Sequence, residues 1–289
     1  MIPETSVYLR PTRLEAALAE LARTRVTVLA GGTDVYPAHV GRNPPAAVLD
    51  ISALPGIRAI EQRDGVLRFG ALTTWSDLVR TPLPGWCRAL SQAAQEVGGV
   101  QIQNRGTLGG NLCNASPAAD GVPPLLALDA RVEVASARGV RQLALDAFVL
   151  GNRRTALAPD ELLTAVEVPL RSARAVSCFL KLGHRRYLVI SIAMVAVVLD
   201  FDDDNVVSYC GIGVGACSAA ARRLVDLERG LVGTPRAGVP ARAAALLNAG
   251  LLDALAPIDD VRATRDYRLD AARRLVERAL VELSRETGA

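Results

Sequence analysis

Two glycine-rich segments contain the residues whose types and spacing best fit a chemical role. The first glycine segment follows a β-branched run and comprises Val28, Leu29, Ala30, Gly31, Gly32, Thr33, Asp34 and Val35. Backbone N–H groups can approach a phosphate here because glycine has no Cβ, and Thr33 adds a hydroxyl donor. The third glycine of the G-x-G-x-x-G dinucleotide fingerprint is missing, so an ordinary turn after a strand is the alternative interpretation.

The second glycine segment comprises Thr107, Leu108, Gly109, Gly110 and Asn111. Its composition again predicts a surface of backbone donors suited to a pyrophosphate. Ser116 and Pro117 then predict the start of a helix that runs into the apolar stretch 122–128, because serine is a good N-cap and proline a good first helical residue. A capped helix after a flexible loop is the alternative. Two such segments in one chain favour a ligand that carries two phosphates.

Other catalytic patterns are absent from the sequence. The two histidines have no carboxylates at metal-ligand spacing, and there is no G-x-S-x-G, H-E-x-x-H or P-loop motif. Asp202–Asp204 resembles the opening of a calcium loop but lacks its glycine and distal glutamate, which favours a solvated turn. The five cysteines include no C-x-x-C pair, which argues against disulfides, a zinc site or an iron–sulfur cluster. Cys113 is assigned no role.

Composition narrows the class of protein further. A chain of 289 residues is long enough for about two domains. Its 33 basic and 30 acidic residues are mixed along the chain, which argues against nucleic acid or an anionic membrane as the main partner. The longest apolar run, 188–199, is well short of the ~20 residues that span a bilayer, and no signal peptide is recognisable. We therefore expect a reduced, cytoplasmic protein.

The surrounding pattern predicts elements that would position both segments. A helix is predicted at 13–23; after it, a strand at 25–29, a polar helix start at Thr33-Asp34 and a strand at 47–51 predict a parallel βαβ unit. Asp64-Gly65 predicts a hairpin turn, Thr74 or Ser76 a helix cap, and residues 98–120 a long loop. The remaining predicted elements are a helix at 87–97, strands at 131–135, 142–145, 162–168, 176–182, 191–201 and 206–215, and helices at 219–231, 240–255 and 270–284.

Read together, these segments make a family recognisable. The motifs A-G-G-T-D (30–34), N-R-G-T-L-G-G-N (104–111) and S-P-A-A-D (116–120) resemble the FAD-binding subunit of the molybdenum hydroxylases, a family that includes xanthine dehydrogenase and carbon monoxide dehydrogenase. The resemblance covers nearly the whole chain, and further matching stretches lie at 151–157, 160–169, 181–196 and 258–268.

The resemblance implies an α+β protein of two domains. Residues 1–174 would form a two-lobed FAD-binding fold of the vanillyl-alcohol-oxidase type, with subdomains of about 1–53 and 54–174. Residues 175–289 would form an α/β C-terminal domain, an antiparallel sheet with a helix bundle.

The resemblance also assigns roles to residues. The first glycine segment would wrap the FAD pyrophosphate, and the second would hold it from the other side. Asn114 and Asp120 match positions that hydrogen-bond the polar chain of the cofactor, and Leu163 and Lys181 match positions near the flavin ring. Lys181 is the only lysine; a fixed cation there would stabilise the reduced, anionic flavin and tune its potential, whereas the alternative is a solvated surface lysine. The loop 185–191 would lie over the ring.

The implied function is electron transfer. Electrons would leave a substrate at a molybdenum cofactor in a large partner subunit and pass through [2Fe-2S] clusters in a small partner subunit of a heterotrimer. They would then reduce the FAD of this chain and go on to an external acceptor such as NAD. No side chain need act as an acid or base, because the flavin carries the chemistry. The first segment contains no His or Cys, so we expect noncovalent FAD, and the chain lacks the four clustered cysteines of the branch with an additional iron–sulfur cluster.

Two other functions stay open from the sequence. One is a self-sufficient flavin oxidoreductase with its own substrate pocket. The other is a scaffold subunit without FAD, against which the intact glycines count.

Overall fold

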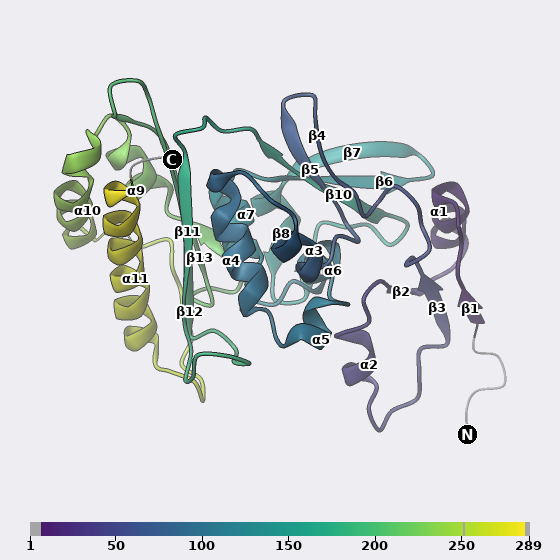
Figure 1. Cartoon of the computed structure of the whole chain (residues 1–289). Coiled ribbons are helices and arrows are strands. Elements are labelled where there is room, and N and C mark those ends of the chain that lie inside the picture. Colours follow the sequence, from purple (N-terminus) through teal and green to yellow (C-terminus); the bar gives the residue numbers. More distant parts are fainter. Residues whose placement is uncertain (1–6, 251, 287–289) are drawn as a thin grey trace.

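Among the described residues, three larger sheets follow one another along the chain, each with its own helices, and a fourth sheet has only two strands (Figure 1). The computed structural model describes residues 7–250 and 252–286. The predicted α+β architecture is confirmed, because the described residues form many helices, a small parallel sheet and larger antiparallel sheets. Across the described residues, no helix combines the length and the apolar character that crossing a membrane requires.

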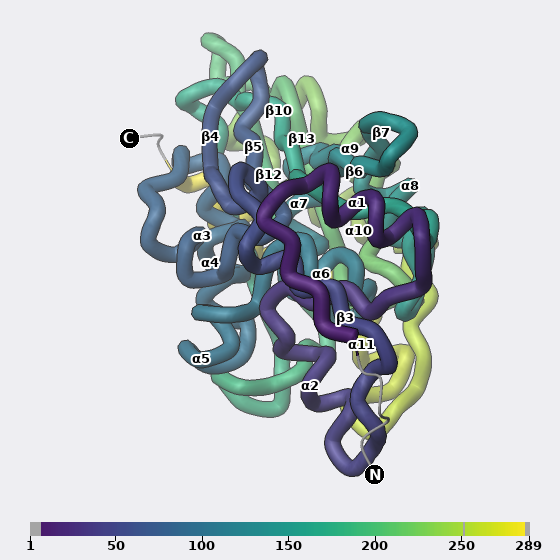
Figure 2. The backbone as a smooth tube through the Cα atoms, turned by 90° about the vertical axis from the view of Figure 1, so that its right-hand side faces the viewer, coloured from purple at the N-terminus to yellow at the C-terminus, as the bar shows by residue number. Residues whose placement is uncertain are grey.

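The N-terminal lobe is a small parallel sheet, as the sequence predicts. Its strand order is β1-β3-β2, and β3 pairs in parallel with both neighbours. Helix α1 covers the sheet because Ala17, Leu18 and Leu21 recur at helical spacing and are buried. Figure 2 views the molecule from the side of this lobe. The elements are β1 (Val7–Leu9), α1 (Leu14–Arg23), β2 (Thr27–Leu29), α2 (Val35–Ala38) and β3 (Ala47–Asp50).

The second lobe is an antiparallel sheet of order β4-β5-β10-β6-β7. The hairpin turn predicted at Asp64-Gly65 is confirmed: both residues have positive φ, 49° and 78°, as a type I′ turn requires. Thr74 caps α3 in a capping box with Asp77. The strands are β4 (Ile60–Arg63), β5 (Val66–Gly70), β6 (Arg131–Ser136), β7 (Gly139–Ala144) and β10 (Leu162–Pro169), and a separate pair joins β8 (Val149–Gly151) to β9 (Arg154–Thr155).

Five of this lobe's helices lie between β5 and β6, and two predictions about that region are wrong. The expected loop 98–120 contains two helices, because Leu108 and Leu112 are buried and Thr107 caps the second of them. The helix expected from Ser116-Pro117 begins only at Val122; Ser116 Oγ instead accepts a hydrogen bond from the Ala118 N–H in a local turn. The helices are α3 (Trp75–Arg80), α4 (Arg88–Glu96), α5 (Val100–Gln103), α6 (Leu108–Asn114) and α7 (Val122–Ala127); α8 (Leu145–Phe148) follows β7.

The C-terminal part is a four-stranded antiparallel sheet covered on both faces (Figure 1). Every residue of β12 is buried, because alternate residues join two different cores. Met194 and Ala196 face α4 and α7, whereas Val195 and Val197 face the C-terminal helices. This double burial explains the long apolar run in the sequence. The elements are β11 (Val176–Leu182), β12 (Ala193–Phe201), β13 (Val207–Gly215), β14 (Arg222–Arg223), α9 (Val225–Leu231), α10 (Val239–Asn248) and α11 (Arg265–Arg285).

Candidate functional site

A pocket of about 370 Å³ opens where the N-terminal lobe meets the second lobe. Most of the residues predicted for the site line it: Val28, Ala30, Gly31, Gly32, Thr33, Asp34, Val35, Thr107, Gly109, Gly110, Asn111, Asn114 and Leu163. The fold thus brings together two glycine segments that are more than seventy residues apart in sequence. Leu29 and Leu108 are instead buried in the hydrophobic cores, and Asp120 and Lys181 lie outside this lining.

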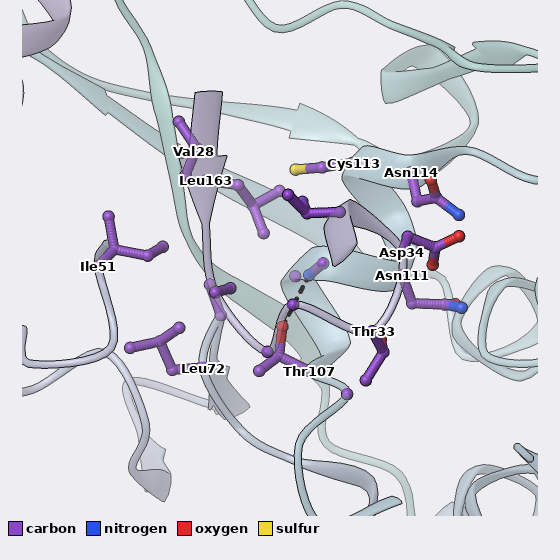
Figure 3. A pocket seen from close by; sticks show the side chains of 18 of the residues that line it. Val28, Thr33, Asp34, Ile51, Leu72, Thr107, Asn111, Cys113, Asn114 and Leu163 are labelled. Atoms are coloured by element: carbon purple, nitrogen blue, oxygen red, sulfur yellow. Dashed lines mark hydrogen bonds between the residues drawn. The ribbon is translucent and has the colours of Figure 1, made fainter. Parts of the chain in front are cut away.

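The pocket has a polar end and an apolar end (Figure 3). Thr33, Asp34, Asn111 and Asn114 gather at one side of the view. The opposite side is apolar and carries Val28, Ile51, Leu72 and Leu163. A ligand with a polar chain and a flat apolar ring fits such a division.

The first glycine segment presents unused backbone donors to the pocket. Within the described part of the chain, none of the five N–H groups of residues 31–35 donates a hydrogen bond to another protein group. A Cβ at Gly31 would lie 1.9 Å from the carbonyl oxygen of Arg105, so glycine is needed for the two lobes to meet here. Gly32 has a φ of +77°, the left-handed region that favours glycine. These amides suit an anion with several acceptor oxygens.

The second glycine segment differs, because its backbone donors are already engaged. The Leu108 N–H donates to the Thr73 carbonyl at 2.8 Å and the Gly109 N–H to the Ala71 carbonyl at 2.9 Å. The Gly110 N–H donates to Thr107 Oγ1 at 3.0 Å (Figure 3). These bonds fasten α6 to the second lobe, so the donor surface predicted from this sequence is largely consumed by the fold.

Asn111 supplies what the second glycine segment still offers a ligand. Its Oδ1 is buried and has no hydrogen-bond partner among the described residues, although its residue lines the pocket. A buried acceptor without a partner is costly, and a hydroxyl-bearing chain would satisfy it. Together with the open amides of the first segment, this acceptor fits a cofactor with a pyrophosphate and a polyhydroxylated chain.

Several lining residues were missed by the sequence analysis. Cys113 lies one helical turn after Gly109 on α6 and opens onto the pocket; a helix prediction at 108–114 would have revealed it. The surrounding protein atoms keep water from its thiol and raise the pKa of that thiol to about 12, so it stays protonated at neutral pH. Trp75, Val97 and Ile102 also line the pocket, and no local pattern in the sequence marks them.

Lys181 and Asp120 form a buried pair beside a second cavity of about 680 Å³. Lys181 Nζ lies 2.7 Å from Asp120 Oδ2, the Ser191 hydroxyl donates to Asp120 Oδ1 at 2.7 Å, and Lys181 also donates to the Glu96 carbonyl at 3.4 Å. Only 7% of the lysine side chain and 9% of the aspartate side chain are exposed. A solvated surface lysine is therefore the wrong interpretation.

The buried pair also links the two parts of the chain. Asp120 precedes α7, whereas Lys181 is on β11 and Ser191 precedes β12. Burial raises the pKa of Asp120, and the Lys181 ammonium opposes that rise. Glu96, whose carbonyl accepts a hydrogen bond from the Lys181 ammonium, lines the second cavity, and the next residue, Val97, lines the first.

Metal ligands do not gather at either cavity. In the regions 7–250 and 252–286, no group of three or more His, Cys, Asp or Glu residues could hold a metal ion.

Comparisons with known proteins place this architecture. A family model described as the FAD binding domain in molybdopterin dehydrogenase matches residues 3–171, and one described as the CO dehydrogenase flavoprotein C-terminal domain matches residues 179–283. The chain is 32% identical over 284 residues to the nicotine 6-hydroxylase medium subunit of Paenarthrobacter nicotinovorans, covering 97% of this chain and 98% of that one. It is 34% identical over 236 residues to the nicotinate dehydrogenase FAD-subunit of Eubacterium barkeri, covering 79% and 80%.

A solved structure agrees with these relatives. The carbon monoxide dehydrogenase of Hydrogenophaga pseudoflava contains a chain with a TM-score of 0.85 to this one, at 28% identity and with 97% and 98% of the two chains covered.

Proposed function

Because this chain belongs to the family of FAD-binding medium subunits of the molybdenum hydroxylases, we propose that it transfers electrons within a three-subunit complex. A small partner subunit delivers them from [2Fe-2S] clusters, and a large partner subunit holds the molybdenum cofactor at which the substrate is oxidised. FAD bound to this chain supplies the redox chemistry and passes electrons to an external acceptor such as NAD. Relatives named as medium chains and as a complex subunit support this arrangement.

The observation that carries the proposal is that the pocket has a polar end with open amides and a separate apolar end. The open amides of the first glycine segment would bind the pyrophosphate, since the N–H groups of residues 31–35 have no protein acceptor among the described residues and all five residues line the pocket. Asn111 and Asn114 bind the polar chain between the phosphates and the ring. The apolar end beside Leu163 would hold the flavin ring. The second glycine segment contributes a wall and the Asn111 side chain rather than a second row of amides.

Lys181 and Asp120 act on the ring from behind the wall formed by Val97. Both oxygens of Asp120 accept hydrogen bonds within the protein. The ammonium of Lys181 favours negative charge on the reduced ring, and its partner Asp120 moderates that effect.

The same geometry favours noncovalent binding. Cys113 is the one cysteine of the described lining, and its thiol, with a pKa raised to about 12, is a poor nucleophile at neutral pH. We also place the boundary between the FAD-binding and C-terminal domains at about residue 174, between β10 and β11.

Reconstitution of the isolated chain tests the proposal. The chain is stripped of small molecules, incubated with FAD and desalted; we expect absorbance near ~450 nm, where oxidised flavin absorbs, and quenching of Trp75, which lines the pocket. A protein that stays colourless would favour the scaffold function. Anaerobic bleaching by NADH tests NAD as the acceptor by the reverse reaction. Turnover of small alcohols or heterocycles without partner chains would instead identify a self-sufficient oxidoreductase.

A further inference from the structure

The charges around the pocket do not match an anionic ligand. The lining contains two carboxylates, Asp34 and Glu161, but no lysine, arginine or histidine. A pyrophosphate adds about two negative charges, and like charges within a few ångströms repel. Open amides supply only partial positive charges, so a cation outside the lining has to balance the site.

Glu161 is already balanced. The Arg141 guanidinium donates two hydrogen bonds to its carboxylate, both at 2.7 Å, and the Ala158 N–H donates a third at 2.8 Å. Arg141 holds the pKa of Glu161 below its usual range. The negative charge of Glu161 is therefore neutralised by Arg141 within the protein.

Asp34 is the carboxylate left at the polar end, and one arginine reaches it. Arg153 Nη1 lies 3.8 Å from Asp34 Oδ1, and the two side chains are 60% and 59% exposed. A pair this exposed and this long binds weakly, so the guanidinium is free to exchange Asp34 for a phosphate oxygen. Guanidinium groups are well suited to phosphate because they stay charged and can donate two parallel hydrogen bonds.

The backbone of Arg153 is held in place more firmly than its side chain. Arg153 lies in the turn between β8 and β9 with a φ of +56°, a costly conformation for a residue with a Cβ. Its N–H donates to the Ala115 carbonyl at 2.9 Å, and Ala115 ends α6. The main chain of Arg153 is thus fastened to the helix of the second glycine segment, while its side chain reaches Asp34 of the first.

We propose that Arg153 is a cofactor-positioning cation, which joins the two glycine segments across the polar end of the pocket and neutralises Asp34 so that a pyrophosphate can bind the open amides. The inference rests on the proposed FAD site and adds to it a residue outside both segments. Removing the guanidinium leaves Asp34 and the phosphates facing each other without a counter-charge.

Binding constants test the assignment without any activity assay. FAD affinity is measured by quenching of Trp75 for the full chain and for Arg153→Gln, with Arg154→Gln as the matched control, since Arg154 is the exposed neighbour on β9. We expect Arg153→Gln to weaken FAD about tenfold at low salt and less at high salt, because exposed charges are screened. Arg154→Gln should stay within about twofold of the wild type, and Arg153→Lys should retain most of the affinity.

A second substitution separates charge from structure. If Arg153 acts by neutralising Asp34, Asp34→Asn added to Arg153→Gln should restore most of the lost affinity. Arg153→Gly provides an independent check of folding, because glycine adopts the φ of this position readily. Equal affinities of Arg153→Gln and Arg154→Gln, or no recovery in the double variant, would overturn the inference. A wild-type chain that binds no FAD would overturn the proposed function itself.

Discussion

The two glycine segments have similar compositions and line the same pocket, but they differ in whether their backbone N–H groups have protein acceptors. The first segment leaves the N–H groups of residues 31–35 without protein acceptors, whereas the second gives the N–H groups of residues 108–110 to Thr73, Ala71 and Thr107. Glycine permits close packing in both segments, but only the first segment leaves its N–H groups without protein acceptors among the described residues. A Cβ at Gly109 would lie 2.7 Å from the Ala71 carbonyl oxygen.

The positions of the segments in the fold explain the difference. The second begins α6, which lies against β5 and β10 and buries Leu108 and Leu112. The first-turn donors of a helix need partners, and in a buried position the protein must supply them. The first segment follows the end of β2, a short parallel strand, and lines the pocket. A ligand can therefore accept hydrogen bonds from the N–H groups of this segment.

Gly31→Ala should have the largest effect on FAD affinity. The added Cβ would lie 1.9 Å from the Arg105 carbonyl oxygen, a backbone atom that cannot move aside cheaply, so the first segment must move away from the backbone of Arg105. We expect affinity to fall by more than about a hundredfold, or about 2.7 kcal/mol. Equilibrium dialysis with FAD measures this, and Gly85→Ala, whose Cβ would meet nothing within 4 Å, is the control. Unchanged binding in Gly31→Ala would mean that the junction does not shape the site.

Gly110→Val tests the second segment and should rank next. A Cβ there meets only Thr107 Oγ1, at 2.8 Å, which disturbs the cap of α6, and because Gly110 lines the pocket we expect the added methyl groups to take up space that the ligand needs. We expect loss of most FAD affinity from a folded protein, measured by flavin absorbance and thermal unfolding. Steric filling is the cause, since the φ of Gly110 is not in the positive range.

Thr107→Val separates the two effects of that substitution. It removes the capping hydroxyl without filling the pocket, which should cost about 1 kcal/mol of stability and lower the Tm by about 2–4 °C. FAD affinity should stay within about threefold of the wild type, because the Thr107 hydroxyl already serves Gly110. A loss of FAD as large as that of Gly110→Val would mean that the cap, and not the free space, governs binding.

Asn111→Leu should have a smaller effect: it should raise the thermal stability of the FAD-free chain and lower the affinity for FAD. Without FAD, the unpartnered Oδ1 is a cost, so its removal should raise the Tm of the FAD-free chain. With FAD, a hydrogen bond is lost and affinity should fall about five- to tenfold. Thermal unfolding with and without FAD tests both signs in one experiment; a lower Tm without FAD would show that Asn111 has a structural partner instead.

Local signals in the sequence were enough for part of this picture. Asp64-Gly65 dictates its own turn, and Thr74 with Asp77 dictates a helix start, because each interaction spans at most three residues. The first glycine segment was also recognisable, since a strand that ends in Gly-Gly is a local pattern. The Lys181 partner could not be predicted in this way, because Asp120 lies 61 residues away and only tertiary packing brings the two residues together.

The second glycine segment also could not be predicted from local sequence, because tertiary contacts determine its structure. Glycine and asparagine are poor helix formers, so residues 108–114 resembled a loop. Burial of Leu108 and Leu112 and the backbone bonds to Thr73 and Ala71 outweigh that propensity. The same tertiary contacts decide which amides remain for a ligand, which is why composition alone could not separate the two segments.

Lys181→Met lies outside both segments and should change FAD affinity least while altering the redox potential. An unpaired charge at ~6 Å in an effective dielectric of ~20 would shift the potential by about 50–60 mV. Asp120 changes this expectation. Removing the ammonium, which opposes the burial-driven rise, raises the pKa of Asp120 further, so at low pH the carboxyl takes up a proton and the site stays neutral. At high pH the carboxylate remains charged and disfavours the anionic reduced flavin.

We therefore expect Lys181→Met to lower the two-electron potential only slightly at low pH and progressively more as the pH rises. Its stability should follow the same direction: a carboxyl whose folded pKa exceeds its unfolded pKa stabilises the protein at low pH, and that stability is lost as the pH rises through the folded pKa. Spectroelectrochemical titration across pH measures the first effect and thermal unfolding the second. Lys181→Arg should change neither the potential nor the thermal stability in this way. Adding Asp120→Asn to Lys181→Met should remove the pH dependence of both the potential and the stability. A shift of the potential that does not vary with pH would mean that Lys181 acts as an isolated charge and that its bond to Asp120 does not moderate the flavin.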